Sequence, residues 1–287
     1  RCCSSAASDV YKRQIYTLSE ILGIPDEDRQ KLVSWMEFLE LAQYFTYEMI
    51  KEQNEGKTDS TPDPAMIDMF NVMIDEMFDY GRFILKKKRK HPSNDLLSAI
   101  ANAKIKGQEL SDEFLDGSWL LIIFAGNDTT RNTMSGGIKL LHDNQHQKEL
   151  LINNHDLLPG FINETVRCVS PVIHMRRTSL IETEIGGQKI GPHEKIALWY
   201  GAANRDPEIF DKPDEFNIQR ENAEKHLAFG IGRHTCLGKP IALMQLNEFY
   251  SQFLQRFPDF EMNGEWKVAP NNFVHAIQEM PIKFSKE

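Results

Sequence analysis

The residues best suited to chemistry lie in one loop near the C-terminal end of the sequence, from Phe229 to Gly238. This loop holds a single cysteine, Cys236, with glycines at 230, 232 and 238, and a helix-like apolar segment follows it. Glycine lets the backbone approach a flat ligand closely, and a helix N-terminus stabilises a thiolate. A thiolate facing a wide, flat space suits a haem iron as axial ligand. By itself the loop fits this chemistry and a buried structural cysteine equally well.

Other chemistries for the same loop are weaker. Its Gly-x-Gly pair lacks the Gly-Lys-Ser/Thr ending of a phosphate-binding loop. His234 and Cys236 could supply two zinc ligands, but no second Cys/His pair stands at a suitable spacing. Cys236 could also be a hydrolase nucleophile that works with a distant histidine, such as His174 or His275.

Glu164 and Arg167 are three residues apart, so they meet on one face of a predicted helix. By itself this spacing is typical of an ordinary surface ion pair, which contributes at most about 0.5 kcal/mol.

A third segment, Ala125 to Thr130, interrupts a very apolar stretch with a glycine, an aspartate and two threonines. Glycine and threonine lower helix propensity, and a hydroxyl that bonds to the preceding turn can open a helix locally. A carboxylate and a hydroxyl among small residues suit a site that holds a small molecule and delivers protons. A packing notch between helices is an equally good interpretation of this segment alone.

The elements that must position these residues are mostly helices. Helical spacing and start signals predict helices from Pro25, from Pro64, from Ser111 to about His142, from Pro159 to Pro171, and from Pro240, with a short helix capped by Asn94. Gly186 and Gly187 centre a predicted hairpin, residues 183–190, and residues 195–200 form a further strand candidate. The sequence therefore predicts a mainly α fold with a minor β component.

Composition excludes several classes of protein. There are 33 Lys and Arg against 42 Asp and Glu, a net charge of −9, which argues against a nucleic-acid partner. The longest apolar run, residues 119–125, is far too short to cross a bilayer. We therefore expect a soluble, cytoplasmic protein. Residues 1–14, which start with Arg1 rather than Met, are expected to be a non-native or disordered leader.

In this order and spacing, the three features resemble the cytochrome P450 family of haem-thiolate monooxygenases, from about Ile15 to the end. The loop matches the family's haem signature at Phe229, Gly230, Gly232, His234, Cys236 and Gly238. Glu164 and Arg167 match its Glu-x-x-Arg pair, and Arg220 looks like the third member of that structural network. Ala125, Gly126, Asp128 and Thr129 match the oxygen-activating kink of the central helix.

The resemblance implies a role for each matched residue. Cys236 is the ligand of the iron of haem b, and Phe229, Gly230, Gly238 and Ala125 lie against the haem. Arg176 and His234 bind its propionates. Thr129 holds dioxygen by a hydrogen bond, and Asp128 relays protons. Glu164, Arg167 and Arg220 maintain the fold, whereas Cys2, Cys3 and Cys168 have no matching role, and Cys168 is expected to be core.

The chain also departs from the family pattern, because the early helices and the N-terminal strands have no counterpart. Residues 15–287 are therefore expected to be a partial domain, the C-terminal two-thirds of the family fold, and to hold haem weakly.

The branch resembled is that of bacterial hydroxylases of alkanes, fatty acids or sterol side chains. Such enzymes take electrons from NAD(P)H through a ferredoxin and its reductase, and Arg233 and Lys239 could meet an acidic ferredoxin. Candidate substrate contacts are Ile122, Ala125, Val172 and Ile173. The alternatives are a haem protein that uses peroxide or acts as a sensor, and a Cys/His hydrolase or zinc module.

Overall fold

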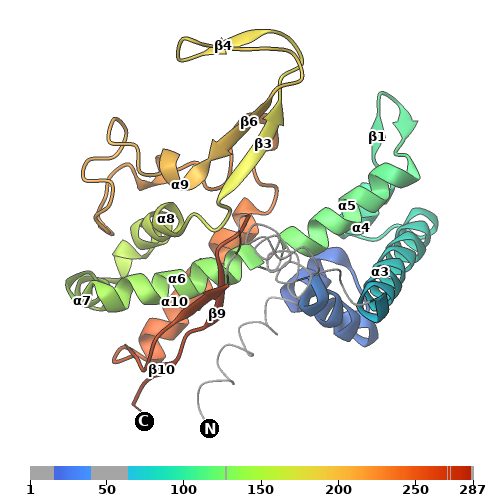
Figure 1. Ribbon diagram of the computed structural model, residues 1–287. Coiled ribbons are helices and arrows are strands. Elements are labelled where there is room, and N and C mark those ends of the chain that lie inside the picture. Colours follow the sequence, from blue (N-terminus) through green and yellow to red (C-terminus); the bar gives the residue numbers. More distant parts are fainter. Residues whose placement is uncertain (1–15, 40–63, 127, 270, 272, 286–287) are drawn as a thin grey trace. The chain divides into compact units, whose positions relative to one another are not determined.

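The structure of this protein is a computed structural model, which describes residues 16–39, 64–126, 128–269, 271 and 273–285. These residues are mainly helical, with short antiparallel strands, as the sequence predicts (Figure 1). The chain divides into two compact units, residues 1–128 and 129–287. The predicted leader, residues 1–14, lies outside the described residues, and the division into a leader and one partial domain stays a prediction.

The first unit is built around helices. Residues 16–22 and 29–39 are helical, with the 3-10 turn η1 (Asp26–Asp28) between them, followed by α3 (Pro64–Lys90), α4 (Leu96–Ala101) and α5 (Asp112–Ala125). A small hairpin, β1 (Lys104–Ile105) with β2 (Gln108–Glu109), joins α4 to α5. Its core is closed by Trp119, whose indole Nε1 donates to the Met77 carbonyl at 2.9 Å and whose ring meets Trp35 edge-on.

The start of α4 differs from the prediction by one residue. Asp95, not Asn94, caps the helix, because its Oδ1 accepts the Ser98 amide at 2.8 Å. The Lys88 ammonium lies 2.5 Å from the other Asp95 carboxylate oxygen. Burial works against the charged carboxylate, but hydrogen bonds from Lys88, Ser93 and the Ser98 amide lower the pKa of Asp95 to about 2. The same carboxylate therefore caps α4 and pairs with Lys88 on α3.

The helix predicted from Ser111 to about His142 forms as two helices. Ser111 caps α5 as expected, accepting the Phe114 amide. α5 ends at Ala125, and α6 (Asp128–Asp143) begins after the Gly-Asn pair. The Thr133 hydroxyl, one turn into α6, donates to the Thr129 carbonyl at 2.8 Å.

The second unit contains the remaining helices. They are α6, α7 (Gln145–Asn153), α8 (Leu158–Val169), α9 (Tyr200–Ala203) and α10 (Lys239–Arg256), with 3-10 turns η2 (His155–Leu157), η3 (Ala223–Lys225) and η4 (Gly232–His234). α8 ends at Val169, and its C-cap residue Ser170 adopts a left-handed conformation before Pro171. Figure 1 shows α6 and α10 side by side in this unit.

Tyr250 on α10 forms a buried contact with α6. The fully buried Tyr250 hydroxyl lies 3.0 Å from the Thr133 carbonyl and 2.9 Å from that of Met134. Gly137 makes the approach possible, since a Cβ there would lie 2.0 Å from the tyrosine oxygen. The helix that carries Thr129 is thus fixed to the helix that follows Cys236.

The strands of the second unit form two-stranded antiparallel sheets. β3 (His174–Thr178) pairs with β6 (Lys195–Trp199), and the chain between them forms the predicted hairpin of β4 (Thr183–Ile185) and β5 (Gln188–Ile190), which extends beyond them in Figure 1. At the C-terminal end, β7 (Glu261–Met262) pairs with β10 (Ile282–Lys283), and β8 (Lys267–Ala269) with β9 (Ala276–Glu279). None of the described helices is long and apolar enough to cross a membrane.

Candidate functional site

Glu164, Arg167 and Arg220 come together as the sequence analysis expects. Arg167 Nε and Nη2 lie 2.7 and 2.8 Å from the two carboxylate oxygens of Glu164, and both side chains are fully buried. Arg220 comes from a loop 56 residues further on, and its Nε lies 3.1 Å from both oxygens. The Glu164–Arg167 pair is therefore buried. The interpretation of its spacing as an ordinary surface ion pair is wrong.

Backbone carbonyls satisfy the remaining guanidinium donors. Arg167 Nη1 donates to the carbonyls of Asn204 at 2.7 Å and Pro213 at 2.8 Å. Both arginines donate to the Glu215 carbonyl. Burial lowers the pKa of Arg167, but the hydrogen bonds with Glu164 outweigh it and hold that pKa above its usual value. The buried charges are thus paired and hydrogen-bonded, which a buried ion pair requires.

Asn204, which the sequence analysis did not single out, joins this network to the cysteine loop. Its carbonyl accepts from Arg167, and its Nδ2 donates to the Ser170 hydroxyl at 2.8 Å. Its Oδ1 accepts the Leu227 amide at 2.6 Å, at the start of the segment that leads to Cys236. The residue is fully buried although it stands in a polar stretch, Asn204 to Asp206, that reads as an exposed turn.

The cysteine loop is held by its own backbone. The Cys236 amide donates to the Phe229 carbonyl at 2.8 Å, and the Gly230 amide to that of Leu227 at 2.8 Å. Gly230 has a φ of +70°, and a Cβ there would lie 3.0 Å from the His234 carbonyl. Gly238 then caps α10. The predicted glycine roles therefore differ: Gly230 is needed for its conformation, whereas Gly238 has an ordinary φ of −79°.

The surroundings of Cys236 fit a haem. The cysteine is exposed, and the two apolar side chains beside it in the loop, Ile231 and Leu237, are 74% and 76% exposed. Large apolar side chains are normally covered, so a thiol among exposed ones suits a broad apolar ligand with a thiolate-binding metal.

The two residues expected at the haem propionates are free to bind anions. Arg176 lies on β3, paired in register with Ala197, and His234 is the last residue of η4. Both are exposed, and within the described residues neither side chain forms a hydrogen bond or ion pair. Their chemistry fits carboxylates, since arginine binds them in bidentate fashion. Their role at the haem stays a prediction.

The expected oxygen-side residues fall at the boundary of the two units. Asp128 is the first residue of α6, where it is 7% exposed, and Thr129, half-buried, follows it. Ala125 ends α5, and Ile122 is half-buried one turn earlier. Ile122, Ala125 and Asp128 belong to the first unit, and Thr129 and Cys236 belong to the second.

The expected substrate contacts Val172 and Ile173 lie between α8 and β3. Val172 forms an isolated bridge with Val274, and the Ile173 amide donates to the Phe273 carbonyl at 2.8 Å. Both are half-buried. Their role as substrate contacts stays a prediction.

Two further titratable groups lie close to the network. Cys168 is half-buried rather than fully in the core, and burial raises the pKa of its thiol to about 11, so it is protonated at neutral pH. His226, which the sequence analysis missed, is 7% exposed, and burial together with the charge of Lys239 lowers its pKa to about 4. Its Nδ1 accepts the Ala228 amide at 3.2 Å, and its ring contacts Phe229.

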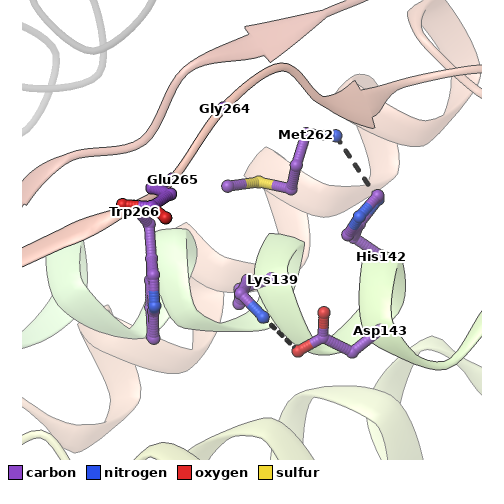
Figure 2. Close-up of a pocket in the computed structure, with 7 residues that line it drawn as sticks. All are labelled: Lys139, His142, Asp143, Met262, Gly264, Glu265 and Trp266. Carbon is purple, nitrogen blue, oxygen red and sulfur yellow. Dashed lines mark hydrogen bonds and ion pairs between the residues drawn. The ribbon is translucent and has the colours of Figure 1, made fainter.

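A shallow pocket of about 340 Å³ lies elsewhere in the second unit, between α6 and the C-terminal strands (Figure 2). Its polar groups pair with one another: Lys139 with Asp143, and His142 Nδ1 with the Met262 amide. None of the predicted site residues lines it; the lining residues are Lys139, His142, Asp143, Met262, Gly264, Glu265 and Trp266.

Within the described part of the chain, no three His, Cys, Asp or Glu side chains gather as a metal site would require, which gives the zinc alternative no support.

Comparison with known proteins agrees with this geometry. Cytochrome P450-terp from a Pseudomonas species is 32% identical over 273 residues, and a steroid C26-monooxygenase from Mycolicibacterium smegmatis is 33% identical over 270 residues. These matches cover 95% and 93% of this chain but 62% and 63% of the relatives, so the chain spans about six tenths of their length. A Mycobacterium marinum cytochrome P450 solved with pseudoionone superposes with a TM-score of 0.81 at 31% identity, over 96% of this chain and 63% of that one.

The family model of cytochrome P450 matches residues 22–284, which is nearly the whole chain. Members of this family carry haem, whose iron a cysteine thiolate ligates. The match includes the buried Glu164–Arg167–Arg220 network, the break between α5 and α6, and the Cys236 loop. The chain belongs to the cytochrome P450 family.

Proposed function

We propose that the protein is a haem-thiolate monooxygenase with Cys236 as the ligand of the haem iron. The observation that carries the proposal is the exposed Cys236 thiol among exposed apolar side chains, in a loop anchored to a buried ion-pair network. When bound, the haem would activate dioxygen for insertion of one oxygen atom into an unactivated C–H bond. The overall reaction consumes O2, two electrons, two protons and the substrate R–H, and it yields R–OH and water.

The protein's own groups would hold the haem and supply protons. Cys236 donates electron density from its thiolate, and Arg176 and His234 neutralise the propionates. Phe229, Gly230, Gly238 and Ala125 would lie against the haem. The Thr129 hydroxyl would hydrogen-bond dioxygen, and Asp128 would move protons inward from solvent, as a general acid–base group does.

The substrate class proposed is an apolar molecule, such as an alkane, a fatty acid or a sterol side chain. The support is the apolar character of Ile122, Val172 and Ile173, together with a relative named a steroid C26-monooxygenase and a solved relative that binds pseudoionone. Electrons would come from NAD(P)H through a ferredoxin and its reductase in the cytoplasm. The exposed Arg233 suits an acidic partner.

The visible spectrum of the reduced protein with carbon monoxide tests the proposal. A red-shifted Soret band is expected from the thiolate, and Cys236→Ala should lose it, whereas Cys168→Ala, the matched control, should keep it. A Soret band that Cys236→Ala leaves unchanged would contradict the assignment of the ligand. A colourless protein with hydrolase activity that depends on Cys236 would favour the Cys/His alternative, and product formation from peroxide alone would favour a peroxide-using haem protein.

A further inference from the structure

Asn204 stands where three segments of the second unit meet. It follows α9, it receives Arg167 from α8, and it reaches the loop that leads to Cys236. Its own amide donates to the Tyr200 carbonyl at 2.8 Å. The side chain is 0% exposed, so water cannot replace these bonds.

The bond to the Leu227 amide matters most for the loop. Leu227 is held on both sides, because its amide donates to Asn204 Oδ1 and its carbonyl accepts from the Gly230 amide. Two residues after Leu227, the Phe229 carbonyl accepts the Cys236 amide. One side-chain oxygen therefore fixes the first point of a short hydrogen-bonded path to the cysteine.

The other half of the amide group fixes Asn204 itself. Its Nδ2 donates to Ser170 Oγ, which in turn donates to the Arg167 carbonyl at 2.8 Å. Arg167 reaches back to the Asn204 carbonyl. These three hydrogen bonds form a ring that includes the buried guanidinium of Arg167. The ion-pair network therefore sets the position of Asn204 Oδ1.

We propose that Asn204 is a positioning residue for the Cys236 loop, coupling the buried Glu164–Arg167 pair to the Leu227 amide. This inference rests on the proposed function, since it concerns the thiolate that would ligate the haem. Asn204 does not touch the reacting atoms. It determines where the loop backbone lies and, through it, the geometry of Cys236.

Hydrogen exchange of the backbone amides tests the inference without any cofactor. In Asn204→Ala the peptide that begins at Leu227 should exchange about tenfold faster or more, because a buried donor loses its acceptor. Ser170→Ala removes the Nδ2 partner but keeps the Oδ1 acceptor in place, so it should accelerate that exchange clearly less than Asn204→Ala does. Asn222→Ala removes another asparagine-to-backbone bond, an exposed one donated to the Ile209 carbonyl, that does not reach the cysteine loop, so it should leave the peptide unchanged.

The carbon monoxide complex gives a second, spectroscopic readout. At a fixed temperature, Asn204→Ala should lose the thiolate band about tenfold faster than the wild type while haem is still bound, and Asn222→Ala should match the wild type. Equal protection of Leu227 in Asn204→Ala and the wild type would overturn the inference, as would equal effects of Asn204→Ala and Ser170→Ala. A wild-type protein with no thiolate band would contradict the proposed function instead, and the exchange measurement would still decide the role of Asn204.

Discussion

Glu164 and Arg167, one helical turn apart on α8, form an ion pair in which both side chains are 0% exposed and two hydrogen bonds of 2.7 and 2.8 Å join them. Breaking a buried pair leaves a charge without its partner, which costs about 3–5 kcal/mol. We expect Glu164→Gln to lower the free energy of unfolding by this amount in urea titrations. Glu215→Gln is the matched control, because Glu215 forms an exposed pair with Lys212 at the same spacing and should cost at most about 0.5 kcal/mol. Similar losses for both variants would contradict the structural role of the buried pair.

Gly230 should resist substitution more strongly than a glycine with the same backbone conformation elsewhere. Its φ of +70° strains any other residue by about 1–2 kcal/mol, and an added Cβ would also press on the His234 carbonyl. Gly186, at the tip of the β4–β5 hairpin, has a φ of +56° and open space around it. We expect Gly230→Ala to lower the thiolate band per haem, and Gly186→Ala to lower only thermal stability. Unchanged spectra in both variants would refute the close-contact argument.

His226 predicts how stability depends on pH. Its pKa is about 4 when folded and near 6.5 when unfolded, so between these values the unfolded chain binds more protons and stability rises with pH. Stability is therefore lost as pH falls from about 6.5 to about 4, by up to about 3 kcal/mol from this group. Urea unfolding from pH 4 to 7.5 should show this slope, and His226→Gln should flatten it. The pKa of His275 is also lowered by burial, so the difference between the two proteins, not the total slope, is the test.

The urea titrations also separate the effect of His226 from that of the carboxyl groups, because the two act in different pH ranges. The pKa of Asp95 is lowered from 3.8 to about 2, so its contribution to stability is lost only as pH falls through that lower range. A difference between the wild type and His226→Gln that lies entirely below pH 4 would contradict the assignment to His226.

Tyr250 should stabilise the second unit more than its size suggests. Its hydroxyl is the group that α10 offers to the Thr133 and Met134 carbonyls, and Tyr250→Phe removes it without changing the ring. We expect a loss of about 1–2 kcal/mol, because the hydroxyl bonds in a fully buried place. Tyr16→Phe is the control: this tyrosine is 53% exposed, so the expected loss is below about 0.5 kcal/mol. The reverse order in urea titrations would argue against the contact.

Asp128 is predicted to act on protons and not on binding. Asp128→Asn keeps the shape of the side chain but removes its proton transfer, for which a loss of about 100-fold or more in product formation is expected. Substrate binding, followed by the spin-state shift of the haem spectrum, should stay within a factor of two. Asp143→Asn, at the other end of α6 and exposed, should change neither. Equal product formation by Asp128→Asn and the wild type would exclude the relay role.

Features that depend on local spacing could be predicted from the sequence. The Glu164–Arg167 contact follows from the i, i+3 geometry of a helix, and the break after Ala125 follows from glycine and threonine in an apolar run. The Ser111 cap is equally local. By contrast, the cap of α4 is Asp95 and not Asn94, and Asp95 also pairs with Lys88, a residue on another helix. The burial that turns a weak surface pair into a central ion pair also comes from distant chain segments.

The positions that the sequence analysis missed share one physical reason. Asn204 and His226 are single polar residues in polar stretches, where nothing local indicates burial. The role of Asn204 appears only when chain segments 23 residues apart meet, in the Asn204–Leu227 bond. Arg220 lies 56 residues from Glu164, and only its resemblance to a family pattern suggested its place.

The long-range contacts described above also have a kinetic consequence. Tyr250 meets Thr133 across 117 residues, and Lys148, buried on α7, donates to the Phe260 carbonyl across 112. Closing such large loops costs chain entropy before any contact stabilises the product, so sequences of this kind fold slowly. The Cys236 loop lies within both of these chain loops, between Thr133 and Tyr250 and between Lys148 and Phe260, so we expect it to reach its final shape late in folding. A cofactor would then bind to a nearly folded protein. It would not act as a nucleus for folding.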